Sequence, residues 1–125
     1  MRKVTPLTRK RAFATIKVVA KAMMEGEHAI SYSDLAVRLG MPNETGRGLG
    51  PILDEAAHMC IEHNLPDVSA VVVTKESLLR GEPMPSMDSF VDGMWPITGV
   101  MIEDVPIIQA QVREFNWREV RQLNL

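Results

Sequence analysis

Hydrophobic side chains recur at helical spacing near the start of the chain and predict two helices there. In residues 8–25, Phe13, Ile16 and Ala20 fall on one face, and the lysines lie largely off it. A second helix is predicted from Ser31, because a hydroxyl followed three residues later by an acid is typical of a helix start. A glycine follows each segment, and glycine suits the left-handed conformation in which helices often end.

The pattern then passes from a third helical segment to a continuous hydrophobic run. Leu49, Leu53 and Ala56 share a face within residues 49–63, which predicts a third helix. Residues 68–74 are rich in valine, a composition typical of a buried strand. We therefore expect three helices followed by a strand.

The pattern is less regular in the second half of the chain. Residues 76–97 hold Pro83 and Pro85 among acids and methionines, which indicates an extended loop or arm. Residues 97–102 are interpreted as a second short strand, and residues 104–115 as a last helix with a proline in its first turn.

This order of elements predicts a single α+β domain over residues 1–125. We expect a winged helix-turn-helix: three N-terminal helices, a small antiparallel sheet, a long loop or arm at residues 76–97 and a C-terminal helix.

Composition places the chain among ordinary globular proteins, with 125 residues, 46% hydrophobic and 24% charged. A single cysteine excludes an intrachain disulfide and is typical of a reducing compartment, so a cytoplasmic location is expected. The hydrophobic runs are too short to span a bilayer, so no membrane partner is expected.

The net charge of −2 conceals an uneven distribution. The first 21 residues hold seven Lys or Arg and no acid, whereas the remainder holds seven Lys or Arg and 16 acids. A basic segment on an acidic body suggests contact with a polyanion, although a helix with solvated lysines would give the same pattern.

Short motifs add a resemblance to a known family. The chain reads S-Y-S-D-L-A at residues 31–36, G-M-P at 40–42 and R-G-L-G at 47–50. This resembles the DNA-binding module of the O6-alkylguanine alkyltransferases and the alkyltransferase-like proteins, which carry S-Y-G-E-L-A, G-x-P and R-A-V-G. By that resemblance, Tyr32 and Arg47 take the places of the residues that rotate a nucleotide out of the duplex.

Two further motifs are similar to those of small winged-helix domains found alone or attached to restriction-type nucleases in bacteria and phages. They are L-P-D-V at residues 65–68 and F-N-W at residues 115–117. The resemblance implies a winged helix that binds DNA.

The alkyltransferase reaction is not expected, because D-V-S-A stands at residues 67–70 where that family has its P-C-H-R nucleophile motif. Cys60 falls on the hydrophobic face of the third predicted helix and is interpreted as a buried thiol. His58, Cys60, Glu62 and His63 lie close in sequence, but no second cluster completes a zinc site. We therefore expect no catalytic residues, metal or cofactor.

The first functional hypothesis is a non-enzymatic protein that binds duplex DNA through the N-terminal end of the third helix and the basic first helix. Its predicted contact residues are Tyr32, Arg38, Asn43, Thr45, Arg47, Lys10, Lys17 and Lys21. Few of these side chains could read bases, so a homodimer or a protein partner is expected as well.

The second hypothesis is a protein-interaction module, such as an adaptor or inhibitor related to phage or bacterial defence. Methionines adapt to irregular partner surfaces and aromatic residues anchor interfaces. The predicted contact residues are Met84, Met87, Phe90, Met94 and Trp95, all in the segment expected to form the arm. The sequence leaves open whether this arm packs on its own core or on another chain.

Overall fold

The computed structural model describes residues 4–42, 46 and 48–125. Helix α1 (Pro6–Met24) begins with a side-chain cap and a proline. The Thr5 hydroxyl accepts a hydrogen bond from the Thr8 N–H at 3.1 Å, and Pro6 occupies the first turn. Its buried face includes Ile16 and Val19. Phe13, expected on that face, is 36% exposed.

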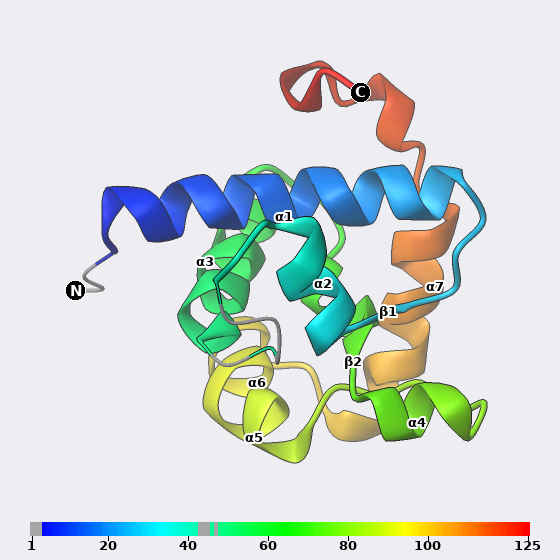
Figure 1. Cartoon of the computed structure of the whole chain (residues 1–125). Helices are drawn as coiled ribbons and strands as arrows, with labels where there is room; N and C mark the ends of the chain where they lie inside the picture. Colours follow the sequence, from blue (N-terminus) through cyan, green and yellow to red (C-terminus); the bar gives the residue numbers. More distant parts are fainter. Residues whose placement is uncertain (1–3, 43–45, 47) are drawn as a thin grey trace.

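The second and third predicted helices are α2 (Tyr32–Arg38) and α3 (Leu49–Glu62). The Ser31 hydroxyl accepts a hydrogen bond from the Asp34 N–H at 3.2 Å, which confirms the predicted N-cap. Helix α1 packs across α3 through its buried face, and Figure 1 shows α1 along one side of the molecule with α2 and α3 beneath it.

The predicted antiparallel sheet is wrong. Strand β1 (Ile30–Ser31) pairs with β2 (Val72–Val73) in parallel, with Ile30 opposite Val72. Residues 68–71, expected to belong to a longer strand, form the 3-10 helix η1 (Val68–Val71), which Asp67 caps by accepting a hydrogen bond from the Ser69 N–H at 2.9 Å. A run of valines therefore folds as one helical turn followed by a very short strand.

The segment expected to be a long loop is largely helical. After α4 (Lys75–Leu79), the elements α5 (Met87–Ser89), η2 (Phe90–Met94) and α6 (Trp95–Thr98) follow one another without a break, with η2 in the wider π-helical geometry. We call residues 87–98 the composite helix. Its last residues fall where a second strand was predicted, so that prediction is also wrong.

The composite helix packs on the rest of the chain. Phe90 and Met94 form a small hydrophobic core with Ala70 and Val105. Gln109 secures this region from α7 (Val105–Glu114), because its side-chain amide donates hydrogen bonds to two backbone carbonyl groups, those of Ala70 at 2.9 Å and Pro83 at 2.8 Å.

The remaining elements are the 3-10 helices η3 (Ile102–Asp104), η4 (Trp117–Glu119) and η5 (Arg121–Leu123). Figure 1 shows the C-terminal segment that contains the last two, coloured red, on the side of α1 away from α2 and α3. The winged-helix prediction is wrong as a whole, because the described chain is mainly helical and its one sheet is a two-residue parallel pair.

Candidate functional site

The N-terminal end of α3 lies against the segment that leads into the composite helix. Leu49, Gly50 and Leu53 of α3 line an open groove together with Tyr32, Gly46, Ser86 and Ser89. The predicted contact residues Asn43, Thr45 and Arg47 lie outside the described residues. The part of α3 that was predicted to enter a DNA groove therefore has protein next to it.

Tyr32 has a structural partner in this groove. Its hydroxyl accepts a hydrogen bond from the Ser86 N–H at 2.9 Å, across 54 positions of sequence. Gly46 lies directly on the tyrosine, since a Cβ atom built at Gly46 would be 2.8 Å from the Cβ of Tyr32. Gly46 also has a φ of +91°, a conformation that other residues rarely adopt. Tyr32 therefore joins α2 to the segment before α5.

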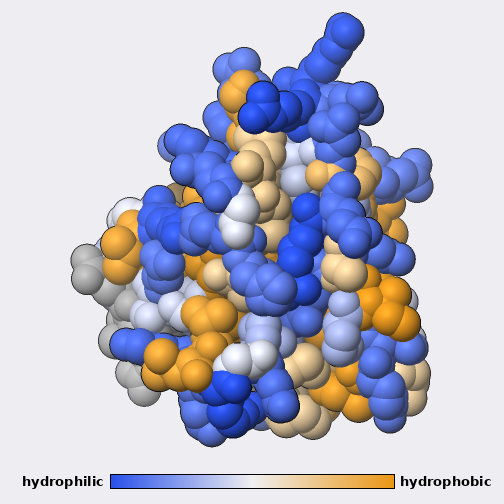
Figure 2. All heavy atoms as spheres, turned by 90° about the vertical axis from the view of Figure 1, so that its right-hand side faces the viewer, coloured by the Kyte–Doolittle hydropathy of each residue, from blue (hydrophilic) through white to orange (hydrophobic). Residues whose placement is uncertain are grey.

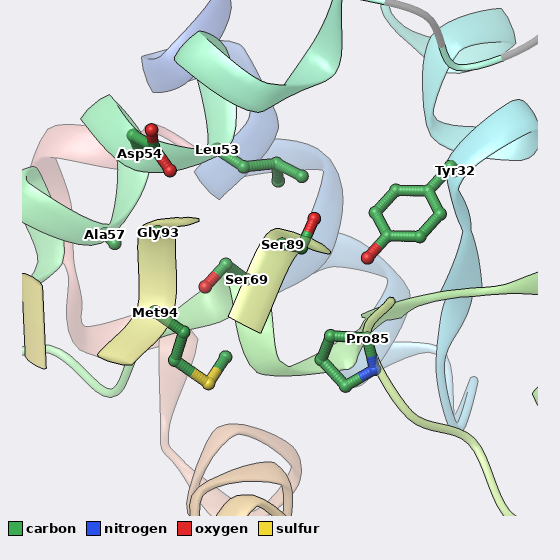
Figure 3. A pocket seen from close by; sticks show the side chains of 9 residues that line it. All are labelled: Tyr32, Leu53, Asp54, Ala57, Ser69, Pro85, Ser89, Gly93 and Met94. Atoms are coloured by element: carbon green, nitrogen blue, oxygen red, sulfur yellow. The ribbon is translucent and has the colours of Figure 1, made fainter. Parts of the chain in front are cut away.

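A narrow cavity continues inward from Tyr32 and Ser89 towards Asp54, Ser69 and Met94, as Figure 3 shows. Its volume of about 20 Å³ is enough for about one water molecule. The cavity is too small for a substrate.

Two carboxyl groups, that of Asp54 in the cavity lining and that of Asp67 two residues before Ser69, have altered acidity. Burial raises the pKa of Asp54; nearby His58 lowers it, and the carboxylate of Asp92 raises it. Burial also raises the pKa of Asp67, which is 8% exposed. One Asp67 oxygen accepts hydrogen bonds from the backbone N–H and hydroxyl of Ser69, while the other is buried without a partner among the described residues. This arrangement holds a neutral acid more easily than a charged one.

Arg38, predicted to contact nucleic acid, is engaged by two acids. Its guanidinium donates to both carboxylate oxygens of Glu27, at 3.0 and 2.7 Å, and to both of Asp34, at 3.1 and 3.0 Å. These hydrogen bonds, first to Glu27 and then to Asp34, raise the pKa of Arg38. The positive charge is therefore already paired within the chain.

Lys10, Lys17 and Lys21 lie together on the outer face of α1, and we call them the lysine row. At about 100° per residue they fall within about 40° of one another, on the side opposite Ile16 and Val19. Lys10 and Lys21 are exposed and Lys17 is half-buried. In Figure 1, α1 lies on one side of the molecule and α5 and α6 lie on the other.

The predicted interaction residues divide between the two faces of the composite helix. Phe90 and Met94 are buried, with only 8% and 4% of their surface exposed, and Met84 is half-buried beside them. Met87 and Trp95 point outward, exposed by 61% and 52%.

Val91, exposed by 48%, lies one turn from each of them and completes a line of three side chains that we call the outer row. Val91 was not among the predicted contact residues, because its i, i+4, i+8 relation to Met87 and Trp95 has meaning only in a helix.

Acidic residues accompany the outer row. Asp88 and Asp92 are exposed beside it, one position after Met87 and Val91. Residues 81–112 hold five acids and no Lys, Arg or His. The outer row thus combines large hydrophobic side chains with negative charge, the opposite sign to the lysine row.

Outside these two surfaces, hydrophobic side chains are exposed in separate groups. On the face shown in Figure 2, hydrophilic residues predominate and hydrophobic ones do not join into a single patch. Among the exposed examples elsewhere are Leu79, Met101 and Ile107. Scattered exposure of this kind is normal in globular proteins.

The described residues give no support to three other kinds of site. They hold no cluster of three His, Cys, Asp or Glu that could bind a metal ion. No helix within the described ranges is both long and apolar enough to cross a bilayer. Cys60 is fully buried, as expected, and burial raises the pKa of its thiol to about 12, so the reactive thiolate is strongly disfavoured.

No protein-family model, curated protein or solved structure matches the chain. The resemblance of residues 31–50 to the alkyltransferase module stays a prediction from short motifs.

Proposed function

We propose that this chain is a non-enzymatic protein-binding module whose contact surface is the outer row Met87, Val91 and Trp95. The observation that carries the proposal is the alignment of three large, half-exposed hydrophobic side chains on one face of a helix whose opposite face is buried. Aligned hydrophobic side chains that include an aromatic residue are typical of binding surfaces.

The same structure gives less support to DNA reading by α3. Tyr32 accepts a hydrogen bond from Ser86, and Arg38 is paired with Glu27 and Asp34. The groove beside the start of α3 is lined on its other side by Ser86 and Ser89. A duplex approaching this end of the helix would therefore meet the segment before α5 as well.

The charge beside the outer row defines the partner that it fits. Asp88 and Asp92 favour a surface in which a hydrophobic strip is flanked by Lys or Arg, because opposite charges at the rim speed encounter and fix orientation. A partner with acids in those positions would be repelled.

The test compares two triple variants in affinity capture and in calorimetric titration with each captured protein. One carries Met87→Ser, Val91→Ser and Trp95→Ser, and we expect it to weaken binding more than about tenfold. The matched control carries Leu79→Ser, Met101→Ser and Ile107→Ser, which remove equally exposed hydrophobic side chains elsewhere. It should bind within about twofold of the unchanged chain.

Both variants should keep their free energy of unfolding within about 0.5 kcal/mol per substitution, because the altered side chains are exposed. Equal binding by the outer-row variant and the unchanged chain would contradict the proposal. So would an equal loss in the control variant.

A further inference from the structure

The lysine row is a straight cationic surface on a rigid element. Helix α1 is anchored by buried side chains between Ala12 and Met23, among them Ile16 and Val19. Because a helix rises 1.5 Å per residue, Lys10 and Lys21 stand about 16 Å apart along the axis, with Lys17 between them. The three lysine side chains therefore leave the helix along one line.

Within the described residues, no ion pair neutralises the charge of the lysine row. Residues 4–24 carry five Lys or Arg and no acid, and the first acid, Glu25, follows the last turn. Among the residues that the structure describes, Arg9 of α1 pairs with Glu55, while the three lysines form no ion pair. They remain available to an external anion.

The distribution of the remaining charge gives the molecule an orientation. Residues 81–112, with five acids and no base, include α5 and α6 on the side away from α1 in Figure 1. A polyanion is attracted to the lysine row and repelled from the composite helix. Only one side of the molecule faces such a partner.

We infer that the lysine row binds the phosphate backbone of duplex DNA without sequence selectivity. Duplex DNA presents about one negative charge per 1.7 Å of axis, so a straight row of lysines meets phosphates along its whole length. Lysine contacts phosphates as a point charge and carries no information about base sequence. This contact replaces groove insertion by α3 and does not depend on the protein-binding function proposed above.

A membrane surface is a poorer match to this helix. Helices that lie on membranes insert a hydrophobic face between the lipids. The hydrophobic face of α1, with Ile16, Val19 and Met23, is buried against the rest of the chain. The exposed side chains of α1 include Leu7 and Phe13, but these are only two beside the lysine row and Arg9.

The experiment is fluorescence anisotropy with a labelled mixed-sequence DNA duplex, titrated with the full chain between about 50 and about 200 mM salt. Three phosphate contacts predict a slope of log K against log salt of about −2.7, equivalent to about fortyfold weaker binding across that range. A second duplex of unrelated sequence should give the same affinity.

Two matched double variants locate the contact. Lys17→Gln with Lys21→Gln should reduce the magnitude of the slope by about 1.8 and weaken binding at low salt at least about tenfold. Lys75→Gln with Arg80→Gln lowers the net charge equally but on α4, and should leave the affinity within about twofold. Circular dichroism should show both variants folded, since these side chains lie at the surface.

Three outcomes would overturn the inference: no duplex binding by the unchanged chain at about 50 mM salt, equal weakening by the two double variants, or a slope that the Lys17 and Lys21 changes leave unaltered. Binding to phosphatidylserine vesicles without binding to the duplex would also overturn it. None of these outcomes bears on the outer row.

Discussion

Asp67 illustrates how a single buried acid couples folding to pH. Its pKa is raised by burial, so the folded chain holds the proton to a higher pH than the unfolded chain does. The stability that this group contributes is therefore complete below the ordinary aspartate pKa of about 3.9 and is lost as pH rises from there through the raised folded value.

We expect Asp67→Asn to flatten this dependence. The asparagine oxygen can still accept the hydrogen bonds from Ser69, but the group no longer titrates. In urea unfolding above about pH 4, the free energy of unfolding of the unchanged chain should fall as pH rises. The fall should be smaller in the variant, by up to about 1.4 kcal/mol per pH unit. Identical pH profiles for the two proteins would show that Asp67 does not titrate differently on folding.

Tyr32 separates a structural role from the role implied by the alkyltransferase resemblance. Tyr32→Phe removes the acceptor of the Ser86 N–H, and we expect a loss of about 1 kcal/mol in the free energy of unfolding. Duplex binding should stay unchanged if α1 carries it. A strong loss of duplex affinity at preserved stability would instead favour a direct role of the tyrosine with nucleic acid.

Among the elements, the composite helix depends on one glycine for its fit against α3. A Cβ atom built at Gly93 would collide with the carboxylate of Asp54. We expect Gly93→Ala to destabilise the chain by at most about 1 kcal/mol in urea unfolding, because the Asp54 carboxylate, the end of a side chain, must turn away from the added methyl group.

Gly50→Ala is the matched control for this substitution. Gly50 lies in α3 with nothing within 4 Å of an added Cβ and without a positive φ. Alanine there should stabilise the helix by about 0.5–1 kcal/mol. Stabilisation by both substitutions would contradict the close packing of the composite helix on α3.

The elements also show which parts of the fold could be predicted. Helices α1, α2 and α3 could be found because periodicity and capping residues such as Ser31 are local signals. The valine run was predicted as a strand because a short hydrophobic stretch fits a strand and a helical turn alike. The hydrogen bond that Asp67 accepts from the Ser69 N–H favours the helical turn. The parallel pairing of β1 with β2 is set by packing between distant residues.

The composite helix was missed for a different reason. The loop was predicted from Pro83 and Pro85, which lie before the helix begins, and Pro96 within the helix removes a backbone donor. The π-helical turn of η2 accommodates this irregularity, with the Trp95 N–H donating to the Phe90 carbonyl five residues earlier. Reading this segment as a loop hid the spacing of the outer row.

At the scale of the whole molecule, charge and hydrophobicity are placed on different sides. The lysine row lies on α1, and the outer row with its acids lies on the composite helix, which Figure 1 shows on the other side. The sequence predicted the lysines and two residues of the outer row as contact residues, but it could not show that they belong to separate surfaces. As proposed, the two surfaces could bind their partners at the same time.

The two tryptophans stand in opposite surroundings. Trp117 is 1% exposed, with its indole N–H donating to the Val112 carbonyl at 2.8 Å, whereas Trp95 is 52% exposed in the outer row. Indole emission moves to longer wavelength and becomes open to aqueous quenchers when the ring meets water. The chain therefore contains two natural optical probes: one reports whether the core is intact, and the other whether the outer row is covered.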